Sequence, residues 1–230
     1  MKKSLNREKL ADQVYVELKE RIRNHRFSPG SRINVEAITD ELDISRTPIW
    51  EAIRRLERDG LVENPGRNKG VYMKTLSRQE ALKLYEVREV LEGLSARLSA
   101  ECITDDALKK LALILEEQQK IVEDRDLIAY SRSDFDFHKT IYDACGNHIL
   151  SEFLENIKNR MQPINIHVAN HLKGFYEDHI RLFEALRNRS SSEAEEAFRI
   201  HNQRVMHIIE EEMEEEMTVG AQSRRSKDAP

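Results

Sequence analysis

The chain has 230 residues, enough for one large domain or two ordinary ones, and its 34% charged and 39% apolar residues are typical of soluble, helix-rich proteins. It contains no uncharged apolar run of about 18 residues, so no membrane-spanning helix is predicted. Residues 1–78 hold 17 Lys and Arg against 12 Asp and Glu, whereas the rest holds 20 against 30, which indicates two modules with different partners.

The amino-terminal end and the two cysteines predict a cytoplasmic protein. The opening MKKSLNREKLADQVY has no apolar segment behind its lysines, so it is not read as a signal peptide. Cys102 and Cys145 lie in helical patterns without C-x-x-C spacing. They are interpreted as buried thiols in a reducing cytosol.

The first 76 residues predict a winged helix-turn-helix domain. A helical stripe over 7–25 ends before Pro29-Gly30, and a short helix follows from Asn34. "SRTP" then precedes a second helix to Asp59, with Gly60 as its left-handed cap. Two β-prone runs, 61–63 and 71–74, flank a Pro-Gly-Arg-Asn-Lys-Gly turn and predict a hairpin.

From residue 77 onward the pattern is helical, and the overall fold class is therefore mostly α. Apolar spacings of three and four predict helices over 78–101, 104–122, 126–144, 148–160, 162–172, 175–188 and 192–215. Residues 77–217 are expected to form an all-α bundle for effector binding and dimerisation. The tail 218–230 lacks apolar residues to bury and is predicted to be disordered.

The helix expected to begin near Pro48 carries the residue types of a major-groove reader. Its exposed face is predicted to hold Arg46, Thr47, Trp50, Arg54 and Arg58, with Thr47 capping the first turn. Its buried face is predicted to be Ile49, Ala52, Ile53 and Leu56. Lys69, at the tip of the hairpin, can enter a minor groove. The alternative interpretation is a solvated basic helix with no partner.

The segment PGSRINVEAITDELDISRTPIWEAIRRLERDGLVENPGRNKGVYM resembles the DNA-binding domain of the GntR family of bacterial transcriptional regulators. The resemblance covers about residues 10–76 and implies DNA contact by the helix and by a wing over 66–70. In this sequence Trp50 stands where the family usually has arginine, and it is expected to meet a thymine methyl or a sugar. The full predicted DNA-binding set is Arg32, Ser45, Arg46, Thr47, Trp50, Arg54, Asn68, Lys69 and Gly70.

Spacing among the later histidines predicts a metal site. Asp134 and His138 lie four residues apart on one helix face, and His179 and His201 flank "NRSSS" symmetrically about residue 190. At about 1.5 Å per residue, these two rings reach the same level of an antiparallel helix hairpin. One Asp and three His suit a divalent transition ion, Zn before Ni or Mn. The alternative is an isolated i,i+4 pair with two solvated or capping histidines.

Asp-x-x-Phe-His, "ACGN", "HIRLFEAL" and a final helix with "RIH" resemble the metal-bearing FCD effector domain of the FadR-type branch of that family. The resemblance covers about residues 78–212 and implies that Asp134, His138, His179 and His201 are the ligands. It makes Arg88 a candidate for binding a small organic-acid effector. A surface ion pair between Arg88 and Glu92 explains that arginine almost as well.

The predicted function is that of a ligand-responsive transcriptional regulator, a repressor, rather than an enzyme. It would bind a palindromic operator in double-stranded DNA as a homodimer, because symmetric operators need two DNA-binding domains. A metal-dependent hydrolytic enzyme with an accessory DNA-binding domain is the alternative, since the same ligands could activate a water. An architectural DNA binder would leave the aligned histidines unexplained.

Overall fold

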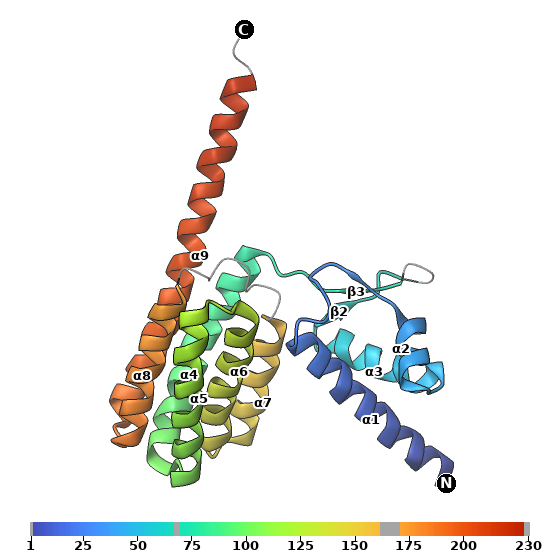
Figure 1. The fold of residues 1–230 in the computed structure, drawn as a ribbon, viewed down its shortest axis with the longest axis horizontal. Helices are drawn as coiled ribbons and strands as arrows, with labels where there is room; N and C mark the ends of the chain where they lie inside the picture. The colour runs from blue at the N-terminus through green and yellow to red at the C-terminus, as the bar shows by residue number, and fades with distance from the viewer. Residues whose placement is uncertain (1, 67–69, 162–170, 228–230) are drawn as a thin grey trace.

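The computed structural model describes residues 2–66, 70–161 and 171–227, and within them the side chains of 9–66, 70–161 and 171–211. A small amino-terminal domain lies beside a bundle of helices, and the end of the first helix faces the bundle (Figure 1). This arrangement confirms the predicted fold class, a winged helix-turn-helix followed by an all-α bundle. In the described part of the chain, none of the helices is long and apolar enough to cross a bilayer.

The amino-terminal domain consists of three helices and a small antiparallel sheet of strand order β1-β3-β2. Its elements are α1 (Lys2–Arg23), β1 (Arg32–Ile33), α2 (Val35–Leu42), α3 (Arg46–Arg58), β2 (Val62–Glu63) and β3 (Val71–Met73). In β3, Tyr72 pairs with Arg32 of β1 and with Glu63 of β2. The hairpin is confirmed, whereas the two-residue strand β1 was not predicted, because alternation cannot be seen over two residues.

Helix α3 begins earlier than the sequence suggested. It was expected to start near Pro48 with Thr47 as its cap, but it starts at Arg46, and Ser45 occupies the cap position without a side-chain hydrogen bond. Pro48 is accommodated because the amides of a first helical turn have no partner within the helix. The buried face of α3 is the predicted one: Ile49, Ala52, Ile53 and Leu56 pack into the domain core.

The carboxy-terminal part contains six helices in the described residues. They are α4 (Arg78–Cys102), α5 (Asp105–Asp124), α6 (Leu127–Ala144), α7 (His148–Arg160), α8 (Leu172–Arg187) and α9 (Ser191–Lys227). The predicted helix over 162–172 falls mostly outside the described residues, because 162–170 are not among them. The predicted hairpin around "NRSSS" is formed by α8 and α9.

The carboxy-terminal tail differs from its prediction. Residues 218–230 were expected to be disordered, but α9 continues as a helix through Lys227. The segment that leads into it, EEEMEEEM, is rich in strong helix formers, and a helix that has already been nucleated extends at little cost. Figure 1 shows this part of α9 leaving the bundle.

A four-residue connection, 74–77, joins the two domains, since β3 ends at Met73 and α4 begins at Arg78. Lys74 N donates to Leu61 O at 3.0 Å, so the connection leaves directly from the sheet. Ser77 and Glu80 form a capping box at the start of α4, in which Ser77 Oγ accepts from Glu80 N at 3.2 Å. Both ends of the connection are therefore fixed.

Candidate metal centre and nucleic-acid interface

The structure brings together the four residues predicted as metal ligands. Asp134 and His138 lie on α6, His179 on α8 and His201 on α9, and one donor atom of each lies within 4.8 Å of the others. The ring of His179 is centred 5.0 Å from that of His201 and 5.3 Å from that of His138. All three imidazoles are buried. We call these four residues the histidine cluster.

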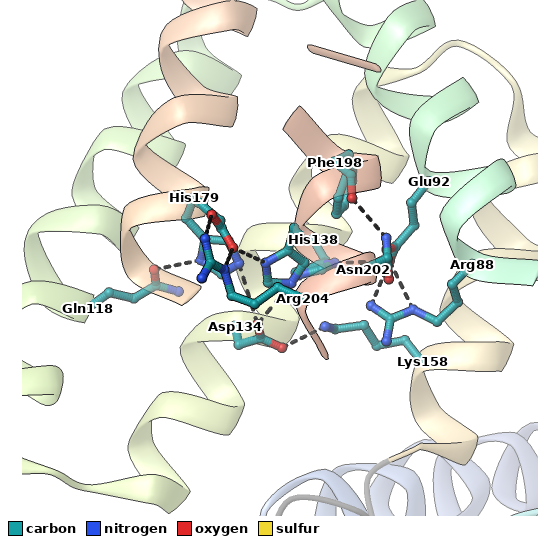
Figure 2. A network of polar contacts seen from close by, with 12 residues as sticks. Arg88, Glu92, Gln118, Asp134, His138, Lys158, His179, Phe198, Asn202 and Arg204 are labelled. Atoms are coloured by element: carbon teal, nitrogen blue, oxygen red, sulfur yellow. Dashed lines mark hydrogen bonds and ion pairs between the residues drawn. The ribbon is translucent and has the colours of Figure 1, made fainter. Parts of the chain in front are cut away.

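Each imidazole of the histidine cluster has an oxygen close to its Nδ1 atom. Glu92 Oε1 lies 3.0 Å from Nδ1 of His138, and Gln118 Oε1 lies 2.9 Å from Nδ1 of His179 (Figure 2). In His201, Nδ1 lies 3.7 Å from a carboxylate oxygen of Asp178. In His138 and His179 these oxygens can accept the ring proton from Nδ1, which leaves the lone pair on Nε2, as in metal-bound histidines.

The Nε2 atoms of His138 and His179 make no hydrogen bond to any of the described residues. Both are buried without a hydrogen-bond partner there. Asp134 Oδ1 lies 3.4 Å from the first and 3.5 Å from the second. Buried polar atoms of folded proteins are nearly always satisfied. Two such nitrogens aimed at one carboxylate therefore fit a bound cation.

The charge states also suit a metal. Burial, and next the neighbouring His201, lower the pKa of His179 well below its usual value, and burial lowers that of His201. Burial alone would raise the pKa of Asp134, but Lys158 and His138 outweigh it, so that pKa lies well below its usual value. The donor set is one carboxylate and two neutral imidazoles together with His138. Divalent transition ions bind this combination.

Lys158 is a residue of this site that the sequence analysis missed. It lies on α7, is buried, and donates from Nζ to Asp134 Oδ2 at 2.6 Å (Figure 2). Burial lowers the pKa of its ammonium group below the ordinary value. Its surroundings in the sequence, ENIKNR, look like an exposed helix face, so no signal in the sequence pointed to it.

Arg88 and Glu92 form a buried ion pair, so the interpretation as a surface pair is wrong. Arg88 donates from Nε at 3.2 Å and from Nη2 at 2.9 Å to Glu92 Oε1. Glu92 Oε2 accepts from Asn202 Nδ2 at 2.6 Å, and Tyr142 also donates to Glu92. Burial by itself would raise the pKa of Glu92. The opposing effect of Arg88, and next of His138, is larger, so the pKa lies well below its usual value.

A small cavity of about 50 Å³ adjoins the histidine cluster. Its polar wall includes Arg88, Asp134, Lys158 and His201. Its remaining walls are mostly apolar and aromatic, and they are formed by Tyr85, Leu127, Tyr130, Leu172, Phe175 and Val205 with Ser131. The predicted effector residue Arg88 and the predicted metal ligands therefore border one cavity.

Three of the predicted DNA-binding residues, Arg32, Trp50 and Gly70, line a groove between α3, the start of α2 and the sheet. Ser45, which precedes α3, and Arg46, Thr47 and Arg54 within it are exposed. Arg32 lies against Gly70, where an added Cβ would come within 2.7 Å of its Nε. Asn68 and Lys69 lie outside the described residues.

Trp50 differs from its prediction as an outward-facing ring. It is half-buried, packs against the core of the amino-terminal domain, and lines the groove together with Arg32, Asn34 and Asn64. The pattern of α3 alone places Trp50 outward, but in the folded domain the adjacent sheet and the start of α2 lie beside this position. Part of the side chain remains accessible from the groove.

Another arginine of α3 has a structural role instead. Arg55 stacks over the ring of Tyr15 at 4.2 Å and also pairs with Asp12. Tyr15 OH donates to Asp59 at 2.6 Å. These contacts attach α1 to α3, which leaves Arg46 and Arg54 as the arginines of α3 in the predicted set that face solvent.

The end of α1 contacts α6, which carries Asp134 and His138, and α7, which carries Lys158. His25 Nε2 lies 3.0 Å from Ser131 Oγ on α6, and the guanidinium of Arg23 lies 5.1 Å from the ring centre of Phe135. Lys19 Nζ lies 3.0 Å from Glu155 Oε1 on α7. Ser131 and Phe135 are neighbours of Asp134 along α6, so the DNA-binding domain rests directly on the candidate metal centre's supporting helix.

Comparison with known proteins agrees with this geometry. Residues 10–72 match the model described as bacterial regulatory proteins, gntR family, and residues 83–204 match the FCD domain. The HTH-type transcriptional regulator YdhC of Bacillus subtilis is 29% identical over 86% of this chain and 92% of its own. The HTH-type transcriptional repressor NanR of an Enterobacter species is 27% identical over 87% and 85%.

A solved structure shows the same fold. Escherichia coli McbR/YncC superposes with a TM-score of 0.79 at 22% identity, over 89% of this chain and 98% of its own. The two family matches together account for both domains, and they are matches to regulators and not to hydrolases. The chain therefore belongs to the GntR family of bacterial regulatory proteins, in the FadR-like branch that carries an FCD domain.

Proposed function

We propose that this regulator is a cytoplasmic repressor that binds a palindromic operator as a homodimer and is released when a small organic acid binds beside a divalent metal in the histidine cluster. The repressor role is supported by the likeness to NanR, whose name gives it that role. The family assignment does not support the alternative of a hydrolytic enzyme.

The observation that carries the metal proposal is the orientation of the three imidazoles. His138 and His179 have Nδ1 beside an oxygen acceptor, and their Nε2 atoms are buried without a partner in the described residues. The buried ring of His201 lies 5.0 Å from that of His179 and 5.3 Å from that of His138. Together with Asp134 they would hold the ion. Nitrogen and oxygen donors without thiolate suit Zn, with Ni or Mn as alternatives. The bound ion would supply a Lewis-acidic contact for a carboxylate.

The homodimer is supported by symmetry and by one exposed surface. A palindromic site presents two equivalent halves, which two copies of one domain fit. On α4, Val87 and Val90 lie about one turn apart and are 47% and 55% exposed. A neighbouring apolar pair on the surface of a bundle suits a helix from a second copy.

Arg46→Ala is expected to weaken operator binding by about 1–3 kcal/mol and to relax specificity at one base position. The side chain is 67% exposed, at the start of α3, where an arginine can reach a guanine edge. Duplexes selected from a random pool and their scrambled versions would be compared by fluorescence anisotropy. Lys109→Ala on the remote helix α5 is the control. Equal losses for Arg46→Ala on both duplexes would contradict base reading.

The combined function is tested by substituting His201. The natively purified protein should contain a divalent metal and a small acid, both identified by native mass spectrometry. His201→Ala should lose the metal and the response of operator binding to the acid, whereas operator binding itself should persist because α3 belongs to the other domain. His207→Ala, an exposed histidine of the same helix, is the matched control. A His201→Ala protein that retains both metal and response would exclude this site.

A further inference from the structure

One carboxylate, that of Asp134, is shared between Lys158 and the imidazoles of the histidine cluster. Its Oδ2 accepts from Lys158 Nζ at 2.6 Å, and its Oδ1 lies 3.4 Å from Nε2 of His138 (Figure 2). The side chain of Lys158 is 7% exposed, so water cannot replace a lost partner. If Asp134 gives its charge to a cation, the ammonium group of Lys158 needs another anion.

The buried charges around the cavity balance only without a cation. Arg88 and Lys158 are positive, and Glu92 and Asp134 are negative. Asp178, beside His201, is already paired with Arg204. A divalent cation held by the histidine cluster would leave two positive charges uncompensated inside the bundle. Burying unpaired charge is strongly unfavourable, so a ligand that brings two negative charges is preferred to one that brings a single charge.

Arg88 and Lys158 differ in how firmly their partners hold them. Glu92 accepts two hydrogen bonds from Arg88 and contacts no residue of the histidine cluster other than His138. Lys158, in contrast, is paired with a predicted ligand of the metal. Both cations border the cavity. Only Lys158 has a partner, Asp134, that a bound metal ion would also engage.

The cavity limits the size of the ligand. Its volume of about 50 Å³ corresponds to roughly three to five waters, at about 10–15 Å³ each. One wall is charged, and Leu172 and Phe175 contribute to the apolar walls. The space therefore suits an acid of a few carbons and not a sugar-sized molecule.

We propose that Lys158 binds a carboxylate of the effector in exchange for Asp134, and that the effector is accordingly a small dicarboxylate. The inference rests on the metal centre proposed above. In the absence of metal, Lys158 is paired with Asp134 and the cavity stays neutral. With Asp134 engaged by metal, the ammonium group is available to one carboxylate while the other reaches the metal centre.

The test uses the full-length protein, stripped with a chelator and reloaded with Zn²⁺, and two acids that differ by one carboxylate, malonate and propionate. By calorimetry, wild type should bind malonate at least about tenfold more tightly than propionate. Lys158→Met should reduce malonate affinity by about ten- to a hundredfold, the range of a charge-assisted hydrogen bond. Its affinity for Zn²⁺ should stay equal or rise, because Asp134 no longer has a competing partner.

Two further variants keep the test decisive. Lys158→Gln retains a donor for Asp134 without the charge and replaces Lys158→Met if that protein does not fold. Lys109→Met, at an exposed position on α5, controls for the substitution itself. Unchanged malonate binding in a Zn²⁺-loaded Lys158 variant overturns the role of Lys158 and leaves the metal centre intact. Loss of Zn²⁺ together with malonate shows a merely structural lysine. A wild type that takes up no Zn²⁺ overturns the metal centre and this inference together.

Discussion

Replacing Glu92 with leucine is expected to lower the free energy of unfolding by about 3–5 kcal/mol. Glu92 is fully buried and accepts from Arg88 and Asn202, and its Oε1 lies 3.0 Å from His138 Nδ1. Leucine has a similar volume, so the loss comes mainly from the uncompensated charge of Arg88 and not from a cavity. Urea unfolding of the metal-free protein, followed by circular dichroism, measures the change.

Two variants of the same helix separate charge from packing. Glu86→Leu changes an exposed glutamate of α4 and should alter stability by no more than about 0.5 kcal/mol. The double variant Arg88→Met with Glu92→Leu should recover much of the loss, because removing both members of a buried pair is often neutral. If Glu92→Leu alone unfolds at the same urea midpoint as the wild type, the buried charge of Arg88 does not need Glu92 for its compensation.

Loading the metal-free protein with Zn²⁺ is expected to raise the free energy of unfolding by about 4 kcal/mol when free metal exceeds its dissociation constant a thousandfold. The reason is that three helices supply the ligands, so unfolding must release the ion. His179→Ala should abolish most of this gain. The measurement is urea unfolding with Zn²⁺ and with excess chelator.

The matched control for this experiment is His207→Ala, since His207 is an exposed histidine that faces Glu211 and lies outside the histidine cluster. It should keep the full Zn²⁺-dependent gain. A gain that survives in His179→Ala would place metal binding elsewhere in the chain, because no other group of three potential ligand residues is found among the described residues.

The histidine cluster could be predicted because its members obey simple helical arithmetic. Asp134 and His138 are one turn apart, and His179 and His201 are equidistant from a turn that the pattern "NRSSS" marks clearly. The rings of the latter two indeed lie 5.0 Å apart. The residues that orient them could not be found this way. Gln118 comes from a helix whose rotation about its axis is set by tertiary packing and not by local sequence.

The main errors concern burial of polar or aromatic side chains. Arg88 and Lys158 look like surface charges because long charged side chains are rarely buried. Only their partners, Glu92 and Asp134, make burial possible, and those contacts span neighbouring helices in the case of Lys158. Trp50 was placed outward because the pattern of α3 says nothing about the sheet beside it.

The four-residue connection at 74–77 makes the contact between the domains effectively intramolecular. Fully extended, it spans only roughly 14 Å, so the two surfaces remain at an effective concentration in the millimolar range even when they separate. Partly exposed ion pairs such as that of Lys19 with Glu155 contribute about 1 kcal/mol each, too little to hold free domains together. Because the connection is so short, these weak contacts are enough to keep the docked and undocked states of the DNA-binding domain close in free energy. A change of about 1.4 kcal/mol in the helical bundle then alters the ratio of docked to undocked DNA-binding domains tenfold.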